Sequence, residues 1–521
     1  QPHPDRLENV KFTSIAWLPD GRGFFYSRYP TADEIPGAPP STHHRVYLHQ
    51  VGTSQDHDEL VYARPDSPDL GFMPFVTDDG AYLVLHVWEG TDSRNRIYYR
   101  PLDSKGEFVR LLDDLDARYE FVEHINGQLV FLTDLDAPLG RLIGIDPSNP
   151  HRSEWKEIIP EGEDAVAHGA LVGNHLITLS LHHAHHRLRL HDLNGVMVDQ
   201  PDLPGLGSVV ELTGGPSDPD LFIGYQSFTQ PPTILRYPME GDGTETLWTS
   251  TTADPDRFIT RQTFATSADG TRIPMFLVSA SELDPDERTP TILYGYGGFD
   301  ISLTPTYQPA RLAFLEQGGL FVVANLRGGA EYGQKWHQAG MLQNKQNVFN
   351  DFIACAEHLI SEGMTSPEHL GILGGSNGGL LVSAVELQRP ELFGAVVPMV
   401  PVTDMLRYHL FTAGRYWTPE YGNAEEDPDH FDFLVEYSPI HNVVRDAEYP
   451  PTLITTADTD DRVVPMHSYK LAATLQQTAA RTKPVYLRVE TRAGHGLGKP
   501  TSKLIEEAAD IYGFFLHHLG G

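Results

Sequence analysis

The stretch Gly371-Ile-Leu-Gly-Gly-Ser-Asn-Gly-Gly379 decides the fold of this chain and supplies a candidate nucleophile. Its apolar start predicts a buried strand that ends near Leu373. The pattern G-x-S-x-G follows, with Ser376 at its centre, and residues 380–387 then have the apolar spacing of a helix. Small glycines permit a sharp turn between a strand and a helix, so the Ser376 hydroxyl would be exposed at the C-terminal edge of a parallel sheet. The stretch therefore predicts a nucleophile elbow.

Candidate acid and base residues follow the serine along the chain. Residues 451–456 predict another buried strand, and an acidic segment, residues 457–462, follows its C-terminal end, where sites form in open α/β sheets. Residues 485–489 predict the next strand, and His495 follows between two glycines. The order serine, aspartate, histidine is that of the α/β-hydrolases. Sequence logic alone leaves three carboxylates open: Asp458, Asp460 and Asp461.

These three residue types have a chemical rationale. A serine hydroxyl alone is a weak nucleophile, a histidine can take its proton and return it, and a carboxylate fixes the tautomer of the imidazole and stabilises its charged form. The glycine-rich turn at Ser376 lies between a predicted strand and helix, and both partners follow it in order. These features favour a catalytic role for the turn over a purely structural one.

Length, charge and cysteine content limit the class of protein. A chain of 521 residues is too long for one hydrophobic core, so two large domains are expected. The net charge of −33 argues against nucleic-acid and anionic-membrane partners, because like charges repel. No run of about 18 apolar residues occurs, so no membrane-spanning helix is predicted. The single Cys355 excludes an intramolecular disulfide, fits a small core position, and is compatible with a cytoplasmic location.

Residues 1–258 are predicted to form an all-β domain. Turn signals recur along this half, and each precedes an apolar strand candidate: Phe24–Tyr26, Tyr82–Leu85, Leu129–Leu132, His175–Leu179 and Leu221–Tyr225. Their spacing of about 45–60 residues is close to the length of one four-stranded propeller blade. We therefore expect a β-propeller in which about five blades are represented.

The pattern changes after residue 258. A hairpin is expected over residues 261–278, and beyond Pro290 predicted strands alternate with predicted helices: strand 291–294, helix 309–317, strand 320–324 and a long helix around 349–360. Such alternation indicates a doubly wound sheet. The prediction is a partial β-propeller over residues 1–258 and an α/β-hydrolase catalytic domain over residues 259–521.

Five ordered motifs carry a resemblance to a known family: Tyr294-Gly-Tyr-Gly-Gly-Phe299, Asn325-Leu-Arg-Gly-Gly-Ala-Glu-Tyr-Gly333, Gly374-Gly-Ser-Asn-Gly-Gly379, Asp460-Asp-Arg-Val-Val-Pro465 and Ala493-Gly-His-Gly496. The chain resembles the prolyl oligopeptidase family of serine peptidases over essentially its whole length. The resemblance implies a seven-bladed propeller that restricts access to short peptides. Because five blades are represented, we expect that the N-terminal segment and first blades are missing, with a separate chain as one possible place for them.

The resemblance also assigns catalytic roles to matching positions. Ser376 resembles the nucleophile and His495 the general base and acid. The family's Asp-x-Arg spacing selects Asp460 as the orienting carboxylate. The oxyanion hole would pair the hydroxyl of Tyr296 with the backbone N–H of Asn377, and such a donor typically contributes about 10²–10³ in turnover.

The substrate pocket implied by the resemblance suits proline. The proline ring is flat and has no N–H donor, so a selective pocket should be aromatic. Trp417 matches the residue that stacks on that ring, and Phe299 and Tyr421 match the other aromatic walls. Arg462 matches the residue that donates to a substrate carbonyl one position upstream, where its rigid guanidinium gives orientation.

The sequence thus predicts a serine endopeptidase that hydrolyses short peptides on the carboxyl side of proline through an acyl-enzyme, with no cofactor and no metal. One alternative is a related oligopeptidase of other specificity, although cleavage after basic residues would need carboxylates in place of Trp417 and Phe299. A second is a peptide ligase or macrocyclase of the same family, since the same triad serves both reactions. A propeller scaffold with a silent hydrolase domain is disfavoured because all three triad residues are present.

Two further features have competing interpretations. The cluster His182-His-Ala-His-His186 resembles a metal site, but alternate residues of a strand face opposite sides, so at most two of its histidines could converge. We expect a hairpin turn of solvated histidines instead. The propeller loop Trp88-Glu-Gly-Thr-Asp92, together with Ala413 and Tyr416 beside the pocket, could shift preference at substrate positions farther from the scissile bond.

Overall fold

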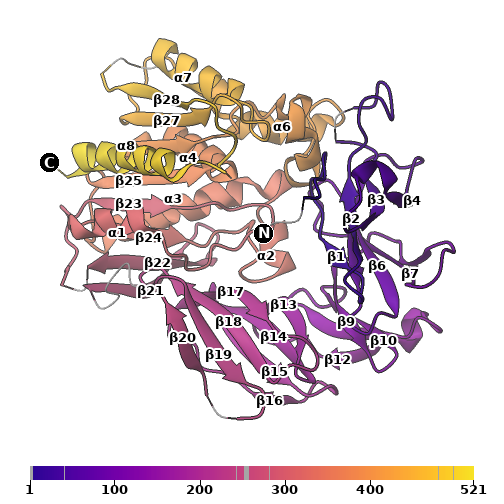
Figure 1. Cartoon of the computed structure of the whole chain (residues 1–521). Helices are drawn as coiled ribbons and strands as arrows, with labels where there is room; N and C mark the ends of the chain where they lie inside the picture. Colours follow the sequence, from indigo (N-terminus) through magenta and orange to yellow (C-terminus); the bar gives the residue numbers. More distant parts are fainter. Residues whose placement is uncertain are drawn as a thin grey trace.

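The computed structural model describes residues 4–39, 41–241, 243–250, 257–280, 282–478, 480, 482–496 and 498–520. Five small four-stranded sheets make up the first half of the chain, and one eight-stranded sheet with helices makes up the second half (Figure 1). In Figure 1 the large sheet lies at the upper left, and the small sheets follow one another in an arc along the right and the bottom.

Each small sheet is a blade built from four consecutive antiparallel strands. The strands of the five blades are β1 (Ala16–Trp17), β2 (Gly23–Arg28), β3 (Arg45–Gln50) and β4 (Glu59–Ala63); β5 (Leu70–Val76), β6 (Tyr82–Glu89), β7 (Arg96–Pro101) and β8 (Val109–Leu112); β9 (Tyr119–Ile125), β10 (Gln128–Thr133), β11 (Arg141–Ile145) and β12 (Lys156–Ile159); β13 (Ala165–Val172), β14 (His175–His182), β15 (His185–His191) and β16 (Met197–Asp199); and β17 (Gly207–Thr213), β18 (Asp220–Ser227), β19 (Thr233–Pro238) and β20 (Glu245–Thr249).

The sequence pattern located the second strand of every blade. The five strand candidates fall on β2, β6, β10, β14 and β18, and the expected number of five blades is confirmed within the described residues. The preceding turns explain the signal. At Asn126-Gly127 and at Gly173-Asn174 both residues have positive φ, which is the turn geometry that matches the twist of a two-residue hairpin.

Apolar side chains fill the spaces between neighbouring blades. The cluster between the second and third blades is fully buried at its centre, and its members include Val84, Ile97, Tyr119, Leu129 and Phe131. Similar clusters join the first to the second blade, the third to the fourth and the fourth to the fifth. Each blade is therefore stabilised mainly by its neighbours, as expected for repeated sheets that bury facing apolar surfaces.

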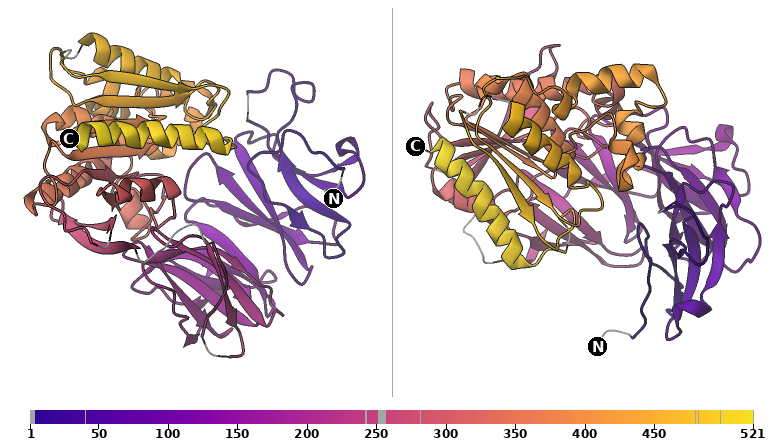
Figure 2. Two further views of the ribbon diagram at one scale, coloured as in Figure 1. Left: turned by 60° about the vertical axis from the view of Figure 1, so that its left-hand side comes forward. Right: turned by 90° about the horizontal axis from the view of Figure 1, so that it is seen from above.

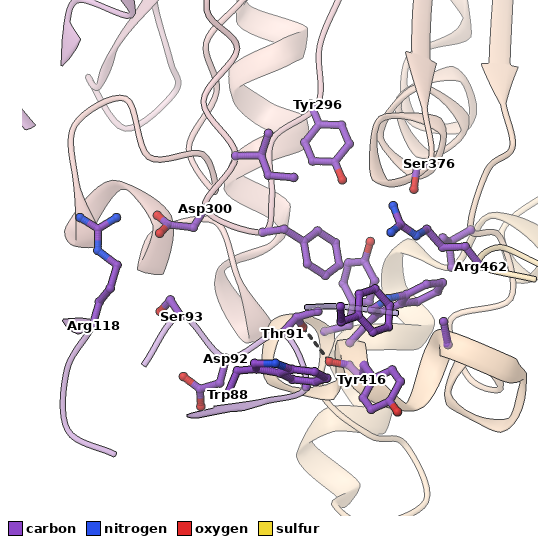
Figure 3. Close-up of a pocket in the computed structure, with 18 of the residues that line it drawn as sticks. Trp88, Thr91, Asp92, Ser93, Arg118, Tyr296, Asp300, Ser376, Tyr416 and Arg462 are labelled. Carbon is purple, nitrogen blue, oxygen red and sulfur yellow. Dashed lines mark hydrogen bonds between the residues drawn. The ribbon is translucent and has the colours of Figure 1, made fainter. Parts of the chain in front are cut away.

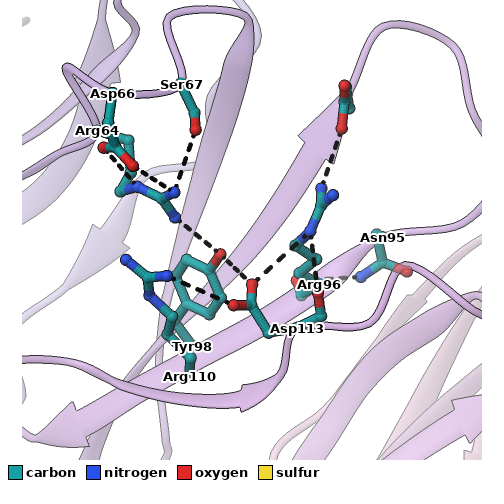
Figure 4. A network of polar contacts seen from close by, with 9 residues as sticks. Arg64, Asp66, Ser67, Asn95, Arg96, Tyr98, Arg110 and Asp113 are labelled. Carbon is teal, nitrogen blue, oxygen red and sulfur yellow. Dashed lines mark hydrogen bonds and ion pairs between the residues drawn. The ribbon is translucent and has the colours of Figure 1, made fainter.

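Polar contacts add to the packing between the first two blades (Figure 4). Arg64, directly after β4, donates to both carboxylate oxygens of Asp66 at 2.8 and 2.7 Å and to the hydroxyl of Tyr98 at 3.2 Å. The Tyr98 hydroxyl donates in turn to Asp113 at 2.5 Å. Because the Tyr98 side chain is fully buried, its hydroxyl needs such partners, and they connect the end of one blade to the middle of the next.

The second half of the chain folds around a sheet with the order β21-β22-β24-β23-β25-β26-β27-β28. Its strands are β21 (Phe258–Thr266), β22 (Arg272–Ala280), β23 (Thr291–Tyr294), β24 (Leu320–Ala324), β25 (Leu370–Gly375), β26 (Ala395–Met399), β27 (Thr452–Ala457) and β28 (Val485–Glu490). The first two strands are antiparallel to their neighbours and the other six are parallel. The strand order reverses beside β23, between β24 and β25, and such a switch point is where open α/β sheets bind ligands.

Helices cover both faces of this sheet (Figure 2). The helices of this half are α1 (Pro309–Glu316), α2 (Gln334–Gln338), α3 (Gln346–Ser361), α4 (Asn377–Gln388), α5 (Thr418–Tyr421), α6 (Pro428–Tyr437), α7 (Met466–Thr478) and α8 (Thr501–Leu519), and α1, α3, α4, α7 and α8 pack against the strands. Two large apolar clusters, one on each face, form the core. Cys355 on α3 is fully buried in the first of them, so the expectation of a small core residue is confirmed.

The sequence assigned most of the second half correctly. The predicted strands at residues 291–294 and 320–324 coincide with β23 and β24, and the predicted long helix is α3. Strand β26 was missed, and it contains Pro398 within a central position of the sheet. The predicted boundary at residue 258 lies at the first residue of β21, and residues 251–256 lie outside the described part of the chain.

The histidine cluster forms the predicted hairpin, but its histidines are only partly exposed. His183 and Ala184 form the turn between β14 and β15, and Ala184 is fully buried against the core of the hydrolase half. The ring nitrogen Nδ1 of His183 lies 2.8 Å from the hydroxyl of Tyr332. The expectation of a fully solvated turn was wrong, because the turn packs against the hydrolase half, which a local pattern does not reveal.

Across the described residues, every helix is too short or too polar to span a bilayer. In the same part of the chain, no group of three or more histidine, cysteine, aspartate or glutamate side chains is arranged to hold a metal ion.

Candidate active site

Ser376 occupies a tight turn between β25 and α4. Its backbone has φ +58° and ψ −115°, a conformation that costs energy for a residue other than glycine. Its N–H donates to the carbonyl of Met399 at 2.9 Å. The neighbouring glycines are required, because an added Cβ on Gly374 would lie 2.2 Å from the carbonyl oxygen of Gly378, and one on Gly378 would lie 2.6 Å from that of Gly295. This is the geometry of a nucleophile elbow.

Asp460 and His495 meet beside that edge of the sheet. Asp460 follows β27, and its buried carboxylate accepts from the backbone N–H groups of Arg462 and Val463, both at 2.9 Å. Its second oxygen lies 2.6 Å from Nδ1 of His495, which follows β28. A carboxylate at this distance accepts from Nδ1–H and leaves Nε2 free to exchange a proton. Among the described hydrogen bonds none joins Ser376 to His495.

The other two carboxylates of the acidic segment have different contacts. Asp458 accepts from the N–H of Ala493 at 3.4 Å, and the hydroxyl of Thr459 donates to the carbonyl of Ala493 at 2.7 Å. Both therefore attach the histidine loop to the end of β27. Asp461 is exposed and lies 3.5 Å from Lys11 of the propeller. Within the described residues, Asp460 alone of the three contacts His495.

Two potential oxyanion donors lie next to Ser376. The hydroxyl of Tyr296, directly beyond β23, points toward Ser376 (Figure 3). Burial raises the pKa of this phenol, so it stays a neutral donor. Asn377 is the first residue of α4, where a backbone N–H has no acceptor within the helix. The Asn377 side chain donates to the carbonyl of Tyr296 at 2.6 Å and accepts from the hydroxyl of Tyr421 at 2.7 Å.

A cavity of about 560 Å³ opens in front of Ser376, between the propeller and the hydrolase half. The residues that the sequence singled out and that line it are Tyr296, Phe299, Ser376, Trp417, Tyr421 and Arg462. The rings of Phe299 and Tyr421 meet edge to face with centroids 5.2 Å apart, and Tyr408 stacks behind Trp417 with centroids 6.1 Å apart. The cavity therefore has an aromatic wall with one guanidinium beside the serine.

The propeller touches the segment that carries the aromatic wall. Thr91 donates through its N–H and its hydroxyl to the carbonyl of Tyr416, at 3.0 and 2.7 Å (Figure 3). Trp88 lies edge-on to the Tyr416 ring with centroids 6.4 Å apart. Tyr416 precedes Trp417 in the 3₁₀ segment Thr412–Trp417. All residues of the loop Trp88–Asp92 except Glu89 line the cavity, and so does Ala413.

Sequence reasoning missed part of the cavity lining. The propeller also contributes Phe12, Met73, His86, Ser93 and Arg118. Their strands and loops show only the alternation of any blade, so no local signal marks them. Asp300 of the hydrolase half could have been found, because it follows Phe299 directly in a recognised motif.

Comparisons with known proteins agree with this architecture. The fold and the site together define an α/β-hydrolase that carries a β-propeller. The family described as "Prolyl oligopeptidase, N-terminal beta-propeller domain" matches residues 1–251, and the one described as "Prolyl oligopeptidase family" matches residues 305–521. The chain belongs to the prolyl oligopeptidase family.

Individual relatives cover almost the whole chain. Prolyl endopeptidase from Elizabethkingia meningoseptica is 39% identical over 99% of this chain and 73% of its own length. The dual function macrocyclase-peptidase of Galerina marginata is 35% identical over 99% of this chain and 72% of its own. A solved structure from a study of two prolyl endopeptidases superimposes with a TM-score of 0.93 at 39% identity, covering 99% of this chain and 76% of that one.

Proposed function

We propose that this protein is a serine endopeptidase that hydrolyses short peptides on the carboxyl side of proline. The observation that carries the proposal is the aromatic cavity formed by Phe299, Trp417 and Tyr421 directly beside Ser376. A flat ring without an N–H gains contact area from aromatic walls and leaves no donor unpaired there. Relatives named prolyl endopeptidase, up to 39% identical to this chain, support the same specificity.

The proposed reaction begins with attack on the prolyl carbonyl. The Ser376 oxygen forms a bond to the carbonyl carbon while its proton passes to Nε2 of His495, and Asp460 stabilises the resulting imidazolium. The charge that develops on the carbonyl oxygen is stabilised by the Tyr296 hydroxyl and the Asn377 N–H. His495 then gives the proton to the leaving amine, and the carbon–nitrogen bond breaks to leave an acyl-enzyme.

Water completes the cycle with the same groups, and it takes the place that the leaving amine had. His495 takes a proton from the water as its oxygen attacks the acyl carbon, and the proton returns to the Ser376 oxygen when the acid leaves. Arg462 lines the cavity beside Ser376 and is placed to donate to the carbonyl one residue upstream of proline. None of these steps requires a cofactor.

A second candidate reaction is transfer of the acyl group to an amine instead of water. Similarity to the macrocyclase-peptidase of Galerina marginata, 35% identical, favours testing it. The same acyl-enzyme would be attacked by the free amino terminus of a peptide, so the product would be cyclic or ligated. Mass spectrometry distinguishes such a product from the hydrolysed one by the absence of one added water.

We further infer that the partners are short proline-containing peptides and that the protein works in the cytoplasm. A cavity of about 560 Å³ between two domains admits a peptide strand more readily than a folded protein. The single cysteine, fully buried, is compatible with a reducing compartment.

Turnover of a blocked Gly-Pro anilide, compared with the matching Gly-Arg and Gly-Ala compounds, tests the proposal. Cleavage confined to the proline compound, and lost in Ser376→Ala, is the expected result. Cleavage after arginine would overturn the specificity. Inactivity on all three compounds together with failure of a fluorophosphonate to label Ser376 would favour a scaffold.

A further inference from the structure

Three buried ionisable side chains lie next to the cavity without a role in the reaction above. Lys345, Glu420 and His337 have side chains only 1%, 2% and 5% exposed. Nζ of Lys345 lies 3.3 Å from one oxygen of Glu420, and Nε2 of His337 lies 2.8 Å from the other. Burying charges costs several kcal/mol per ion, and apolar replacements are often as stable. Stability alone is therefore a weak reason for this group.

Lys345 and Glu420 lie against the short segment Tyr296–Phe299. Nζ of Lys345 donates to the carbonyl of Gly297 at 2.8 Å. The backbone N–H of Phe299 faces the carboxylate of Glu420 and helps to lower its pKa. Together with the bond from the Asn377 side chain to the carbonyl of Tyr296, side chains bind the backbone at two residues of this segment and favour the backbone orientation of a third.

The segment has a backbone conformation that needs such support. Phe299 and Asp300 have φ +59° and +58°, which are strained values for residues with side chains, and Gly297 has φ +64°. A Cβ added to Gly298 would lie 2.8 Å from Nζ of Lys345 and 2.7 Å from Nδ2 of Asn377. The segment is thus packed directly onto the buried network, and it persists in a strained form because its surroundings hold it there.

Glu420 and His337 stabilise each other's charge, whereas burial lowers the pKa of Lys345 despite the neighbouring carboxylate of Glu420. Burial alone would raise the pKa of Glu420, but Lys345 and His337 hold it below its ordinary value. Burial acts to lower the pKa of His337, but Glu420 raises it overall. Asp300, which lines the cavity, lies 3.9 Å from Nδ1 of His337. Removing the Glu420 carboxylate would take the nearest counter-charge from both cations, and removing the Lys345 ammonium would leave Glu420 with His337 alone.

We propose that Lys345 and Glu420 are positioning residues that set the oxyanion donor Tyr296 and the pocket wall Phe299 through their shared segment. His337 holds the second oxygen of Glu420 and so fixes the pair. This inference rests on the proposed function, in which Tyr296 stabilises the oxyanion and Phe299 contacts the proline ring. One buried network then determines both where the charge is stabilised and where the ring binds.

The size of the expected effect follows from the donor that the network positions. Loss of one oxyanion donor typically costs about 10²–10³ in kcat. A donor that is displaced rather than removed should cost less, so Lys345→Met should lower kcat for the blocked Gly-Pro anilide about 10–100-fold. Methionine keeps the length and the apolar stem of lysine and removes only the ammonium.

A double-mutant cycle with Tyr296→Phe separates positioning from a general loss of structure. If Lys345 acts through the Tyr296 hydroxyl, Lys345→Met should lower kcat by no more than about twofold once that hydroxyl is absent. Lys345→Met should also raise KM, because it displaces the pocket wall Phe299. This rise in KM should be the same with and without the Tyr296 hydroxyl. An equal fall in kcat in both backgrounds, or no fall in either, would overturn the proposal.

Two controls keep the cycle interpretable. Glu386→Gln alters another fully buried carboxyl, which accepts from Thr452 and contacts no part of the Tyr296–Phe299 segment, so kcat should stay within about threefold of the parent. Every kcat is expressed per Ser376 labelled by a fluorophosphonate, and a deficit of Lys345→Met that disappears on this basis would contradict positioning. If Lys345→Met does not fold, the double variant Lys345→Met/Glu420→Gln takes its place in the cycle, because it removes both charges of the pair.

The same design distinguishes failure of this inference from failure of the proposed function. If the parent cleaves after a residue other than proline, the specificity is wrong, and the cycle is measured with that substrate instead. If no anilide is cleaved, the rate of fluorophosphonate labelling replaces kcat, because the phosphonyl oxygen uses the same donors. Slower labelling in Lys345→Met, but not when Tyr296→Phe is already present, would still support the network.

Discussion

Ser376 and His495, the two residues of the candidate triad that exchange a proton, are held in place in different ways. Around Ser376 the glycines have no spare room, since added Cβ atoms on Gly374 or Gly378 would collide with backbone oxygens. Around His495 the glycines are open: an added Cβ on Gly494 or Gly496 would meet no atom within 4 Å. The nucleophile is therefore fixed by packing and the histidine by a few hydrogen bonds. We therefore expect the His495 loop to move more easily than the Ser376 turn when the two side chains come together. In the described hydrogen bonds, Ser376 and His495 are not yet joined.

The largest expected effect concerns the one strong attachment of the histidine. Asp460→Asn should lower kcat by about 10⁴ while leaving the fold intact, because an amide no longer fixes the Nδ1–H tautomer or stabilises the imidazolium. Steady-state kinetics with the Gly-Pro anilide measure the loss. Asp461→Asn, whose parent side chain is exposed and pairs with Lys11, is the matched control. Equal losses in the two variants would remove Asp460 from the triad.

Glycine substitutions test the contrast in packing directly. Gly378→Ala should lower kcat by about 10²-fold, because the collision with the carbonyl of Gly295 must shift the elbow or the Tyr296 segment, and small misplacements at a site have effects of that order. Gly494→Ala should change kcat by less than about threefold. The comparison breaks down if the two variants lose similar activity, and thermal melting of both shows whether the fold has changed.

The attachment of the histidine loop gives a smaller effect. Thr459→Val removes the hydroxyl that donates to the carbonyl of Ala493 and keeps the shape of the side chain. One hydrogen bond of this kind contributes about 0.5–1.5 kcal/mol, so kcat should fall about 2–10-fold with little change in KM. A change in KM with kcat unaltered would indicate that the loop shapes the pocket and does not orient His495.

The smallest effect is expected at the contact between the domains. Thr91→Val removes one of two hydrogen bonds to the carbonyl of Tyr416, and the backbone N–H of residue 91 retains the other. KM for the proline substrate should rise by no more than about threefold, because the segment that carries Trp417 keeps most of its support. A large fall in kcat would show that the propeller controls the nucleophile side as well.

Local patterns revealed the elbow and its strands because their causes are local. Glycines at positive φ, apolar runs and turn dipeptides depend on neighbouring residues, so the second strand of each blade and the strands before Tyr296 and Ser376 could be placed correctly. The resemblance to the family then selected Asp460 from three neighbouring aspartates. Local sequence could not make this choice, because it depends on how the chain brings His495 to one of them.

Features that depend on distant residues were out of reach. Lys345 and Glu420 are far apart in the sequence, and each alone resembles an ordinary surface charge. Their pairing follows only from the packing of α5 against the chain before α3. The burial of Ala184 and the propeller side of the cavity likewise depend on how the two halves of the chain meet. Strand β26 was missed because Pro398 is untypical of a central strand.

The complete burial of Cys355 makes the chain a convenient background for attaching probes. It is the single cysteine in the sequence, and burial raises the pKa of its thiol, so reagents that attack thiolates should leave it untouched. Cysteines introduced at exposed positions, such as Val196 on the propeller and Ile505 on α8, would then be the reactive ones. A pair of fluorophores or spin labels at these two sites would report whether the distance between the domains changes when a peptide binds.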